Sequence, residues 1–399
     1  MTKRILFVDD EPLVLNGIER SLRTMRKEWQ MEFVLGGSEA LETMARNPFD
    51  VVISDMRMPR MDGAQLLEQV KHRFPQTVRM ALSGQSDRDT IFRCIGPTHQ
   101  YLSKPCDIEE IKQKLTRALA LRDVLHHPEL KQMVSRMEAV PSLPALLKSL
   151  KLLLDCPNPS VSGVSDLIVQ DMGMTAKVLQ LVNCAFLGTP ARVASAKQAV
   201  SMVGLDNIKI LVHTLGLFSE FTDTLPDPLT HLWCHSLTTA RFAQAIARTE
   251  KSDDYTIECA FTAGLLHNIG SLILACSSEE HSSLTQEITA TASRNNPEAF
   301  NNIHPQVGAY LLGLWGLPAE IIEAVAWHHE PSHAKPTQFS PLIAVHVAAH
   351  YNQRRQPGQA ARKHEGLDES LISHLGLQER LVFWEEACSE IAAERAANA

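Results

Sequence analysis

The segment Ile5–Pro12 reads ILFVDDEP, four apolar residues that run into a cluster of acidic ones. Comparable short apolar runs recur at 33–35, 51–53, 78–82 and 101–102, and stretches with the period of amphipathic helices lie between them. Such runs are typical of strands that are buried on both faces of a parallel sheet. This alternation predicts a doubly wound α/β domain whose five-stranded parallel sheet carries its site at the carboxyl ends of the strands.

The rest of the chain has a different pattern. A helix expected to begin near Asp107 is interrupted by His127 and Pro128, and from Pro141 onward helical periods predominate. We expect helices at 161–171, 174–186, 195–202, 206–220, 229–249, 255–266, 304–315, 318–328 and 340–352. The predicted organisation is an α/β domain at 1–122, a linker or signalling helix at 123–140, an all-α domain at 141–350 and a helical extension at 351–399.

Charge is unevenly distributed over the 399 residues. The net charge of the chain is −8, of which residues 1–122 carry +2 and the remainder carries −10. Binding to nucleic acid needs a dense basic surface, so an acidic second half argues against a DNA-binding output. Ten of the 17 histidines lie between His231 and His350, and this bias calls for an explanation.

The eight cysteines are scattered and form no C-x-x-C pair. They are therefore expected to be reduced, as is usual inside cells. No run of about 18 apolar residues occurs, and the apolar run at the N-terminus is too short for the core of a signal peptide. These features predict a cytoplasmic protein without membrane insertion.

Chemically active residues follow the predicted strands of the first domain. Asp9 and Asp10 follow the first strand, Asp55 ends the third, Ser83 ends the fourth and Lys104 ends the fifth. In a parallel sheet these positions share one edge, where clustered carboxylates repel one another unless a cation lies among them. Ligation by oxygen alone suits Mg²⁺. With a lysine and a hydroxyl nearby for the phosphoryl oxygens, the predicted chemistry is transfer of a phosphoryl group to an aspartate.

Residues 1–122 closely resemble the receiver domain of bacterial response regulators, through the motifs FVDDEP, SDMRMPRMDG, LSG and YLSKP. The resemblance implies that a sensor histidine kinase or phosphotransfer protein phosphorylates Asp55. It also implies Mg²⁺ ligation by Asp10, Asp55 and the carbonyl group of Arg57 with Asp9 acting through water, switch residues Ser83 and Tyr101, and a phosphoryl contact from Lys104 ahead of a cis Pro105.

The histidines of the second domain fall into short motifs. They are His231 and His235 in HLWCHSLTTA, His267 in GLLHNIGSLIL, His304 in NIHPQVGAYLL, His328 and His329 in AWHHEP, and His346 and His350 four residues apart. Imidazoles at positions i and i+4 can share a metal ion, and helix bundles build metal sites where several helices converge. The alternative is that these histidines are packed with waters and hydrogen bonds.

The segments VPSLPALL, VQDMGMTAKVLQLVNCA, AVSMVGLDNIKILV and HHEP resemble an HDOD domain, a relative of the HD phosphohydrolases. Hydrolytic relatives such as the HD-GYP phosphodiesterases have a His-Asp pair whose carboxylate bridges two metals, whereas this sequence has His267–Asn268. Ser271 stands where active members commonly have Lys, and His350 and His231 stand in place of acids. The GYP motif is absent.

These departures favour a non-catalytic output domain. Without the acids, a binuclear centre that generates hydroxide is not expected. The donors that remain, His235, His267, His304, His328, His329 and His350, could at most hold one borderline metal ion. We therefore predict a phosphorylation-controlled response regulator that signals through protein contacts, as a homodimer, to an unknown downstream protein. The alternatives are a metal-dependent cyclic di-GMP phosphodiesterase of HD-GYP type and a module that binds a nucleotide without hydrolysis.

Overall fold

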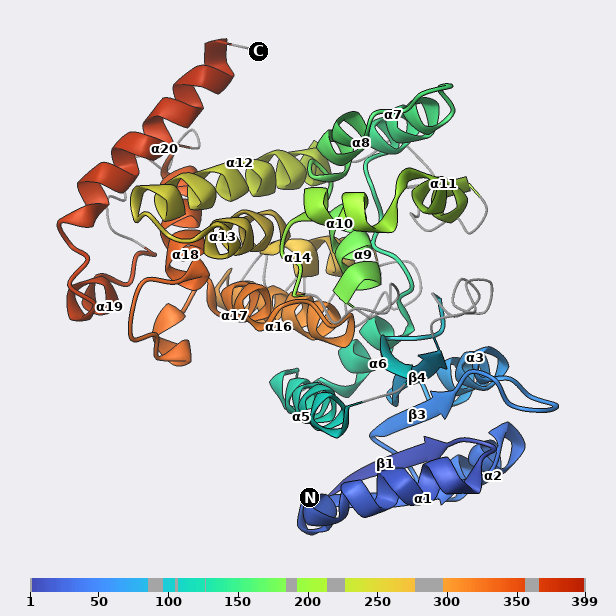
Figure 1. Cartoon of the computed structure of the whole chain (residues 1–399). Coiled ribbons are helices and arrows are strands. Elements are labelled where there is room, and N and C mark those ends of the chain that lie inside the picture. The colour runs from blue at the N-terminus through green and yellow to red at the C-terminus, as the bar shows by residue number, and fades with distance from the viewer. Residues whose placement is uncertain are drawn as a thin grey trace. The chain divides into compact units, whose positions relative to one another are not determined.

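A computed structural model describes residues 2–84, 96–104, 107–125, 127–183, 192–213, 227–276, 297–355 and 366–397 of the chain. The protein forms two compact units. One contains the residues up to Ala139 together with two short later segments, which begin at Gln180 and at Tyr310, and the other contains the rest of the chain from Val140 onward. Their folds are shown in Figure 1.

The first unit is a parallel sheet with helices between its strands, as predicted (Figure 1). The strand order is β2-β1-β3-β4-β5, and every neighbouring pair is parallel. Its elements are β1 (Lys3–Val8), α1 (Pro12–Ser21), a 3₁₀ turn (Arg23–Lys27), β2 (Trp29–Val34), α2 (Gly37–Arg46), β3 (Val51–Asp55), α3 (Gly63–Arg73), β4 (Val78–Gly84), β5 (Gln100–Lys104) and α5 (Ile108–Val124).

The apolar run at the start of the sequence forms an interior strand of this sheet. Residues Ile5–Val8 of β1 are completely or almost completely buried, and β1 pairs with β2 on one side and with β3 on the other. Because successive side chains of a strand point to opposite faces, burial of the whole run requires helices on both faces. The strand order reverses between β1 and β3, which is where ligands bind in open α/β sheets.

The linker forms a separate helix, α6 (Pro128–Arg136). It follows α5 after the predicted interruption, and Pro128 occupies its first turn, where the missing N–H has no helical acceptor in any case. The break at His127 and Pro128 is therefore confirmed.

The second unit is helical, and its described residues form no strand. The long helix α12 packs against α13, α18 and α20 (Figure 1). The helices are α7 (Pro144–Leu154), α8 (Val161–Ile168), α9 (Met172–Asn183), α10 (Ala196–Val203), α11 (Leu205–His213), α12 (Asp227–Thr249), α13 (Asp254–Leu266), α14 (Ile269–Cys276), α16 (Pro297–Leu314), α17 (Ala319–Trp327), α18 (Pro341–Arg354), α19 (Glu369–His374) and α20 (Arg380–Ala397), with a 3₁₀ turn at Pro331–Ala334. The all-α prediction is confirmed, but the sequence pattern missed α14.

One stretch, Asp254–Ala275, is long and apolar enough to cross a membrane by length and composition alone. It comprises α13 and most of α14, with a turn at His267 and Asn268 between them. Of its most apolar window, 72% is buried inside the protein. That burial is typical of a core element of a helical domain.

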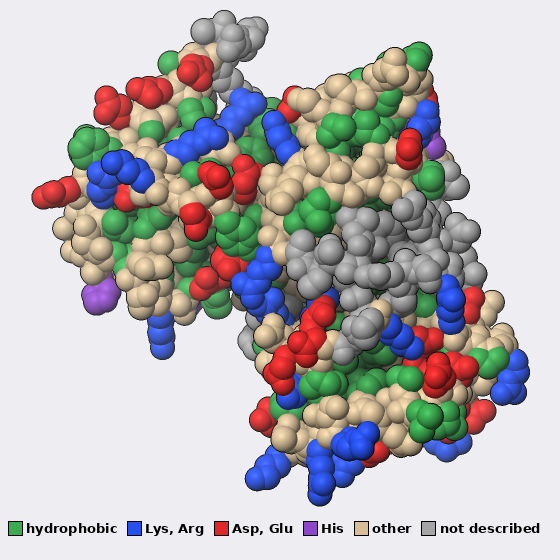
Figure 2. All heavy atoms as spheres, viewed as in Figure 1, with side chains coloured by type: hydrophobic (Ala, Val, Ile, Leu, Met, Phe, Trp, Pro, Cys, Tyr) green, Lys and Arg blue, Asp and Glu red, His purple; other side chains and the backbone are tan. Residues whose placement is uncertain are grey.

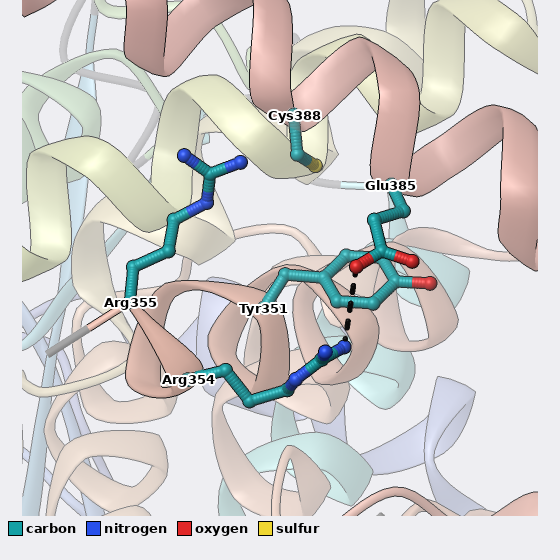
Figure 3. A pocket seen from close by; sticks show the side chains of 5 residues that line it. All are labelled: Tyr351, Arg354, Arg355, Glu385 and Cys388. Carbon is teal, nitrogen blue, oxygen red and sulfur yellow. Dashed lines mark hydrogen bonds and ion pairs between the residues drawn. The ribbon is translucent and has the colours of Figure 1, made fainter. Parts of the chain in front are cut away.

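The C-terminal helix α20 is joined to α18 by polar contacts around a cavity of about 170 Å³ (Figure 3). Arg354 faces Glu385 across this cavity, with 3.3 Å between Nη1 and Oε1. Arg355 donates to the hydroxyl of Ser389 at 2.6 Å, and Tyr351 donates to the carbonyl of Leu381 at 3.0 Å. Because these polar groups bond to one another, we interpret the cavity as part of a helix–helix joint.

Candidate functional site

An acidic pocket lies at the reversal point of the sheet. Asp9 directly follows β1, Asp55 ends β3 and Lys104 ends β5. The two carboxylates are 1% and 6% exposed, respectively. The Nζ atom of Lys104 donates to Oδ2 of Asp9 at 2.8 Å and also pairs with Oδ1 of Asp55. The structure thus brings together three side chains that are far apart in the sequence, as the strand pattern predicted.

Hydrogen bonds fix the end of β3 and with it the carboxylate of Asp55. The N–H of Arg57 donates to Oδ2 of Asp55 at 2.8 Å, and the N–H of Met56 donates to the carbonyl of Leu82 in β4 at 3.1 Å. The loop after β3 brings Gly63 back against the end of this strand. A Cβ atom on Gly63 would overlap the carbonyl oxygen of Asp55. Only a glycine permits such a close return of the loop.

Lys104 offsets part of the negative charge of the pocket. Burial raises the pKa of Asp55, although the nearby Lys104 and the N–H of Arg57 act in the opposite direction. Burial alone would lower the pKa of Lys104, but its bonds to Asp55 and Asp9 hold it above the ordinary value. The amine therefore stays charged beside the two carboxylates.

The oxygen atoms around the pocket fit Mg²⁺ by type. Asp9, Asp10 and Asp55 offer carboxylates, and Arg57 offers a carbonyl group while its side chain is exposed. Asp10 is only partly buried, and it does not join Asp9 and Asp55 in a group whose oxygens all lie within 4.8 Å of one another. Metal binding at all three carboxylates therefore requires at least one of them to move.

The other predicted receiver residues are described unequally. Tyr101 is buried in the core cluster that also contains Leu6 and Val52. Ser83 belongs to β4, but its side chain lies outside the described atoms. Pro105, and with it the expected cis peptide bond, lies outside the described residues. The switch roles of these residues remain predictions.

A chain of imidazoles lies in the helical unit. His235 comes from α12, His267 from the turn between α13 and α14, His304 from α16, and His328 and His329 directly follow α17. The ring centroids are 5.6 Å apart for His235 and His267, 5.0 Å for His267 and His328, and 5.3 Å for His304 and His328. Four separate elements therefore converge on one histidine cluster, which we define as these five residues.

Three members of the histidine cluster could ligate one ion. One ring nitrogen from each of His304, His328 and His329 lies within 4.8 Å of the other two, and in the described part of the chain no other group of histidine, cysteine or acidic side chains does so. Nδ1 of His328 donates to the carbonyl of Val325 at 2.9 Å, which leaves the lone pair of Nε2 for another partner. That buried Nε2 has no hydrogen-bond partner within the described structure.

Asn268 has a specific role in the cluster. Nδ1 of His267 donates to the carbonyl of Gly264 at 2.7 Å, so Nε2 is an acceptor, and the amide of Asn268 lies 2.8 Å from it. The amide therefore covers the lone pair that would face a metal ion. A carboxylate at this position could not donate in this way.

Two further residues of α18 contact the histidine cluster: His346, which the sequence analysis noted for its spacing but did not place in the site, and Asn352, which it missed. Nδ1 of His346 donates to the carbonyl of His328 at 2.8 Å, and its Nε2 accepts from the N–H of Asp368 at 2.9 Å. The amide of Asn352 lies 3.1 Å from Nδ1 of His235. The spacing of HVAAH gave a weak signal for His346, but nothing in the sequence singled out Asn352.

The structure does not bring every predicted histidine into the cluster. His231 is exposed on α12, one turn before His235, so its inclusion in the degenerate site is not supported by its position. His350 is buried, and its ring lies 5.7 Å from that of Tyr351. Ser271 is half-buried on α14, and its N–H donates to the carbonyl of Asn268 at 3.0 Å.

Glycine permits the helix crossing that holds the cluster together. A Cβ atom on Gly270 of α14 would overlap the carbonyl oxygen of His304 on α16 and would lie 2.9 Å from the amide nitrogen of Gly308. The two helix backbones are therefore in direct contact beside two histidines of the cluster.

Burial favours the neutral form of four members of the histidine cluster, His235, His267, His328 and His329. Burial, and then the charge that neighbouring imidazoles would carry, lower the pKa values of His267 and His328 well below 6.5. Burial lowers the pKa of His235, and partial burial together with His346 lowers that of the more exposed His329 to about 4. Neutral imidazoles are the form that binds metal ions.

We expect the helical unit to lose stability as the pH falls from about 6.5 toward 4. The pKa values of these imidazoles are lower in the folded chain than in the unfolded one, so the unfolded chain takes up protons first. Their contribution is complete above pH 6.5 and decreases below it, by up to about 1.4 kcal/mol per imidazole and pH unit. Urea denaturation followed by tryptophan fluorescence at pH 7.5, 6.5 and 5.5 measures the free energy of unfolding at each pH. His328→Gln should flatten the slope, and equal stability at all three pH values would refute the expectation.

Comparison with known proteins identifies both units. Residues 5–116 match the response regulator receiver domain family, and residues 140–331 match the HDOD domain family. The chain therefore carries a receiver domain followed by an HDOD domain. This domain pair is that of a response regulator with an HDOD output domain.

Curated relatives match over parts of the chain. An uncharacterized protein of Treponema pallidum is 29% identical over 249 residues, 61% of this chain and 47% of that protein. The response regulator protein PilR of Pseudomonas aeruginosa is 30% identical over 122 residues, 30% of this chain and 27% of that protein. The chain thus spans less than half the length of either relative.

Solved structures also match. The receiver domain of an HD domain-containing protein from Pseudomonas fluorescens is 32% identical and covers 30% of this chain and 96% of that one, with a TM-score of 0.29. The MmoQ response regulator from Methylococcus capsulatus is 24% identical and covers 59% of this chain and 98% of that one, with a TM-score of 0.43.

Proposed function

We propose that this protein is a cytoplasmic response regulator that accepts a phosphoryl group on Asp55 from a sensor histidine kinase or phosphotransfer protein. Its HDOD domain then signals by protein–protein contact rather than by catalysis. The observation that carries the proposal is the pocket at the reversal of the sheet, where Asp55 lies between Lys104 and the N–H of Arg57 beside Asp9.

The residues of the pocket divide the chemistry among them. A carboxylate oxygen of Asp55 attacks phosphorus, and the bond to the donor's leaving group breaks as the acyl phosphate forms. Lys104 turns its charge from the carboxylates toward the phosphoryl oxygens. Mg²⁺, held by Asp10, Asp55 and the carbonyl of Arg57 with support from Asp9, would neutralise charge on the incoming group.

The histidine cluster supports a non-catalytic output. A bridging carboxylate holds two metals together in the hydrolytic relatives, and here the amide of Asn268 faces Nε2 of His267 instead. The group of potential ligands at His304, His328 and His329 contains no acid to balance the charge of two cations. We therefore propose that phosphorylation changes the oligomeric state, through a homodimer, or changes the exposure of an HDOD surface to a downstream protein.

The test compares the full-length wild type with Asp55→Asn, each with and without beryllofluoride, which mimics the phosphoryl group. Size-exclusion chromatography with light scattering and capture of interacting proteins are the readouts. We expect beryllofluoride to change the oligomeric state or the captured proteins of the wild type and to leave Asp55→Asn unchanged. If wild type and variant behave identically with the mimic, the control by phosphorylation is refuted.

The group His304, His328 and His329 favours a second candidate function, binding of one transition-metal ion. Three imidazole ligands suit Zn²⁺ or Co²⁺ and leave a position open for water. We expect isothermal titration with Zn²⁺ to give at most one ion per chain, and His328→Gln to reduce its affinity by about tenfold or more. His231→Gln, outside the cluster, is the control.

The same preparation distinguishes the enzymatic alternatives. Turnover of cyclic di-GMP that depends on added metal and is lost in His267→Ala would establish a phosphodiesterase of HD-GYP type and would overturn the non-catalytic proposal. Binding of the dinucleotide without turnover would instead favour a nucleotide-binding module.

A further inference from the structure

Arg79 of β4 is a buried arginine whose hydrogen bonds run mainly to backbone carbonyl groups. Only 1% of the surface of this residue is exposed. Nε donates to the carbonyl of Pro97 at 2.5 Å, and Nη2 donates to the carbonyl of Ser135 at 2.6 Å. No carboxylate of the described residues bonds to it. A buried charge is costly unless its donors are satisfied, so these carbonyls hold the guanidinium in place.

His99, directly before β5, completes the arrangement. Nδ1 of this buried residue accepts the backbone N–H of Arg79 at 3.1 Å. Nε2 of the same ring lies 3.1 Å from the carbonyl of Ser135 and 2.8 Å from Nη2 of Arg79. Side chains at the starts of two adjacent strands thus meet at one carbonyl oxygen atom.

That oxygen belongs to the last turn of the linker helix α6, where carbonyls lack a partner within the helix. The C-terminal end of a helix carries partial negative charge, so a cation is favourable there. A second contact lies close by, because Lys71 of α3 forms an ion pair with Glu138, just beyond α6. The side chain of Glu138 also lies so close to Gly96 that a Cβ there would be 2.9 Å from its Oε2.

We propose that Arg79, His99 and the carbonyl of Ser135 form a latch that holds the linker helix α6 against the amino ends of β4 and β5. The inference rests on the proposed function, because it names the path by which the state of the receiver reaches the chain that leads into the HDOD domain. β4 and β5 carry the latch at their amino ends and Ser83 and Lys104 at their carboxyl ends. A shift of either strand along its axis therefore moves both.

The latch is suited to reversible release. Burial lowers the pKa of Arg79 to about 9, which is a measure of the cost of keeping this cation out of water. If the carbonyl of Ser135 moves away, the guanidinium loses its short bond to the helix and gains by reaching solvent. Small displacements are thereby converted into two arrangements of α6, held and released.

The test is amide hydrogen exchange in full-length protein, read over peptides from α6 and, as references, from β1 and β3. Arg79→Gln should increase exchange in α6 by about tenfold or more without changing β1, because a charge-assisted bond is lost. Arg79→Lys keeps the positive charge but loses the planar guanidinium group. This variant should give a smaller increase in α6 exchange and should disturb folding less. Arg73→Gln, at an exposed arginine of α3, is the matched control.

Beryllofluoride separates the latch from the proposed function. If the mimic raises exchange in α6 of the wild type but not of Asp55→Asn, the result supports transmission of the phosphorylation state from Asp55 to α6. Unchanged α6 exchange in both Arg79 variants overturns the latch, whatever the mimic does. If the mimic protects the peptides around Asp55 and leaves exchange in α6 unchanged, transmission from Asp55 to α6 is overturned. If it alters no receiver peptide, the proposed function fails, and the latch is still judged from the Arg79 variants alone.

Discussion

The Asp55→Asn variant is expected to take up no phosphoryl group from a small donor such as acetyl phosphate, whereas the wild type becomes labelled in the presence of Mg²⁺. Asn is nearly the same size, and its amide oxygen can still accept the N–H of Arg57. It lacks the anionic oxygen that attacks phosphorus, so the nucleophile is removed, together with the ion pair to Lys104, while the size of the side chain is kept. Labelling with a radioactive donor, followed by gel electrophoresis, measures the uptake and should fall to background.

Asp62→Asn is the matched control for this experiment. Asp62 caps α3 through a bond from the N–H of Gln65 at 2.8 Å, and Asn caps a helix about as well as Asp. Labelling of this variant at the wild-type level would show that loss of an acid near the pocket is not enough to abolish phosphoryl uptake. Labelling of Asp55→Asn at the wild-type level would place the acceptor on another residue and contradict the proposal.

The sequence predicted the acidic pocket well because a parallel sheet converts strand ends into neighbours. Once Ile5–Val8 is taken as a buried strand, Asp9 must lie at its carboxyl end, and the same argument places Asp55 and Lys104 beside it. Side-chain conformation does not follow from this rule. Asp10 is predicted to be a ligand, yet the oxygens of Asp9, Asp10 and Asp55 do not all lie within 4.8 Å of one another, and the cation that pairs with Asp9 and Asp55 is Lys104.

The histidine cluster was predicted less completely because helix periodicity gives spacing but not the crossing partners. His231 and His235 share one face of α12 by spacing, but only His235 reaches the cluster. Asn352 takes part because α18 packs on α12, a contact between segments more than 100 residues apart. The helix α14 escaped prediction since its apolar residues, in IGSLILAC, form a continuous run without a helical period.

Gly270→Ala is expected to destabilise the HDOD domain by about 3 kcal/mol, a typical upper value for overpacking in a core. The added methyl group would overlap the carbonyl of His304, and backbone, unlike a flexible side chain, cannot rotate away. Helices α14 and α16 must then separate, which moves His267 away from His304. Urea denaturation followed by tryptophan fluorescence suits this measurement, since four of the five tryptophans lie beyond residue 140.

Gly17→Ala tests whether the loss comes from contact or from the substitution itself. Gly17 lies in α1 with nothing near the position of an added Cβ. Alanine is the better helix former, so this variant should gain about 0.5–1 kcal/mol in the receiver. Opposite signs for the same chemical change would assign the effect at Gly270 to the helix crossing. Unchanged stability in Gly270→Ala would instead mean that α14 and α16 can separate at little cost, and that the histidine cluster does not depend on their close approach.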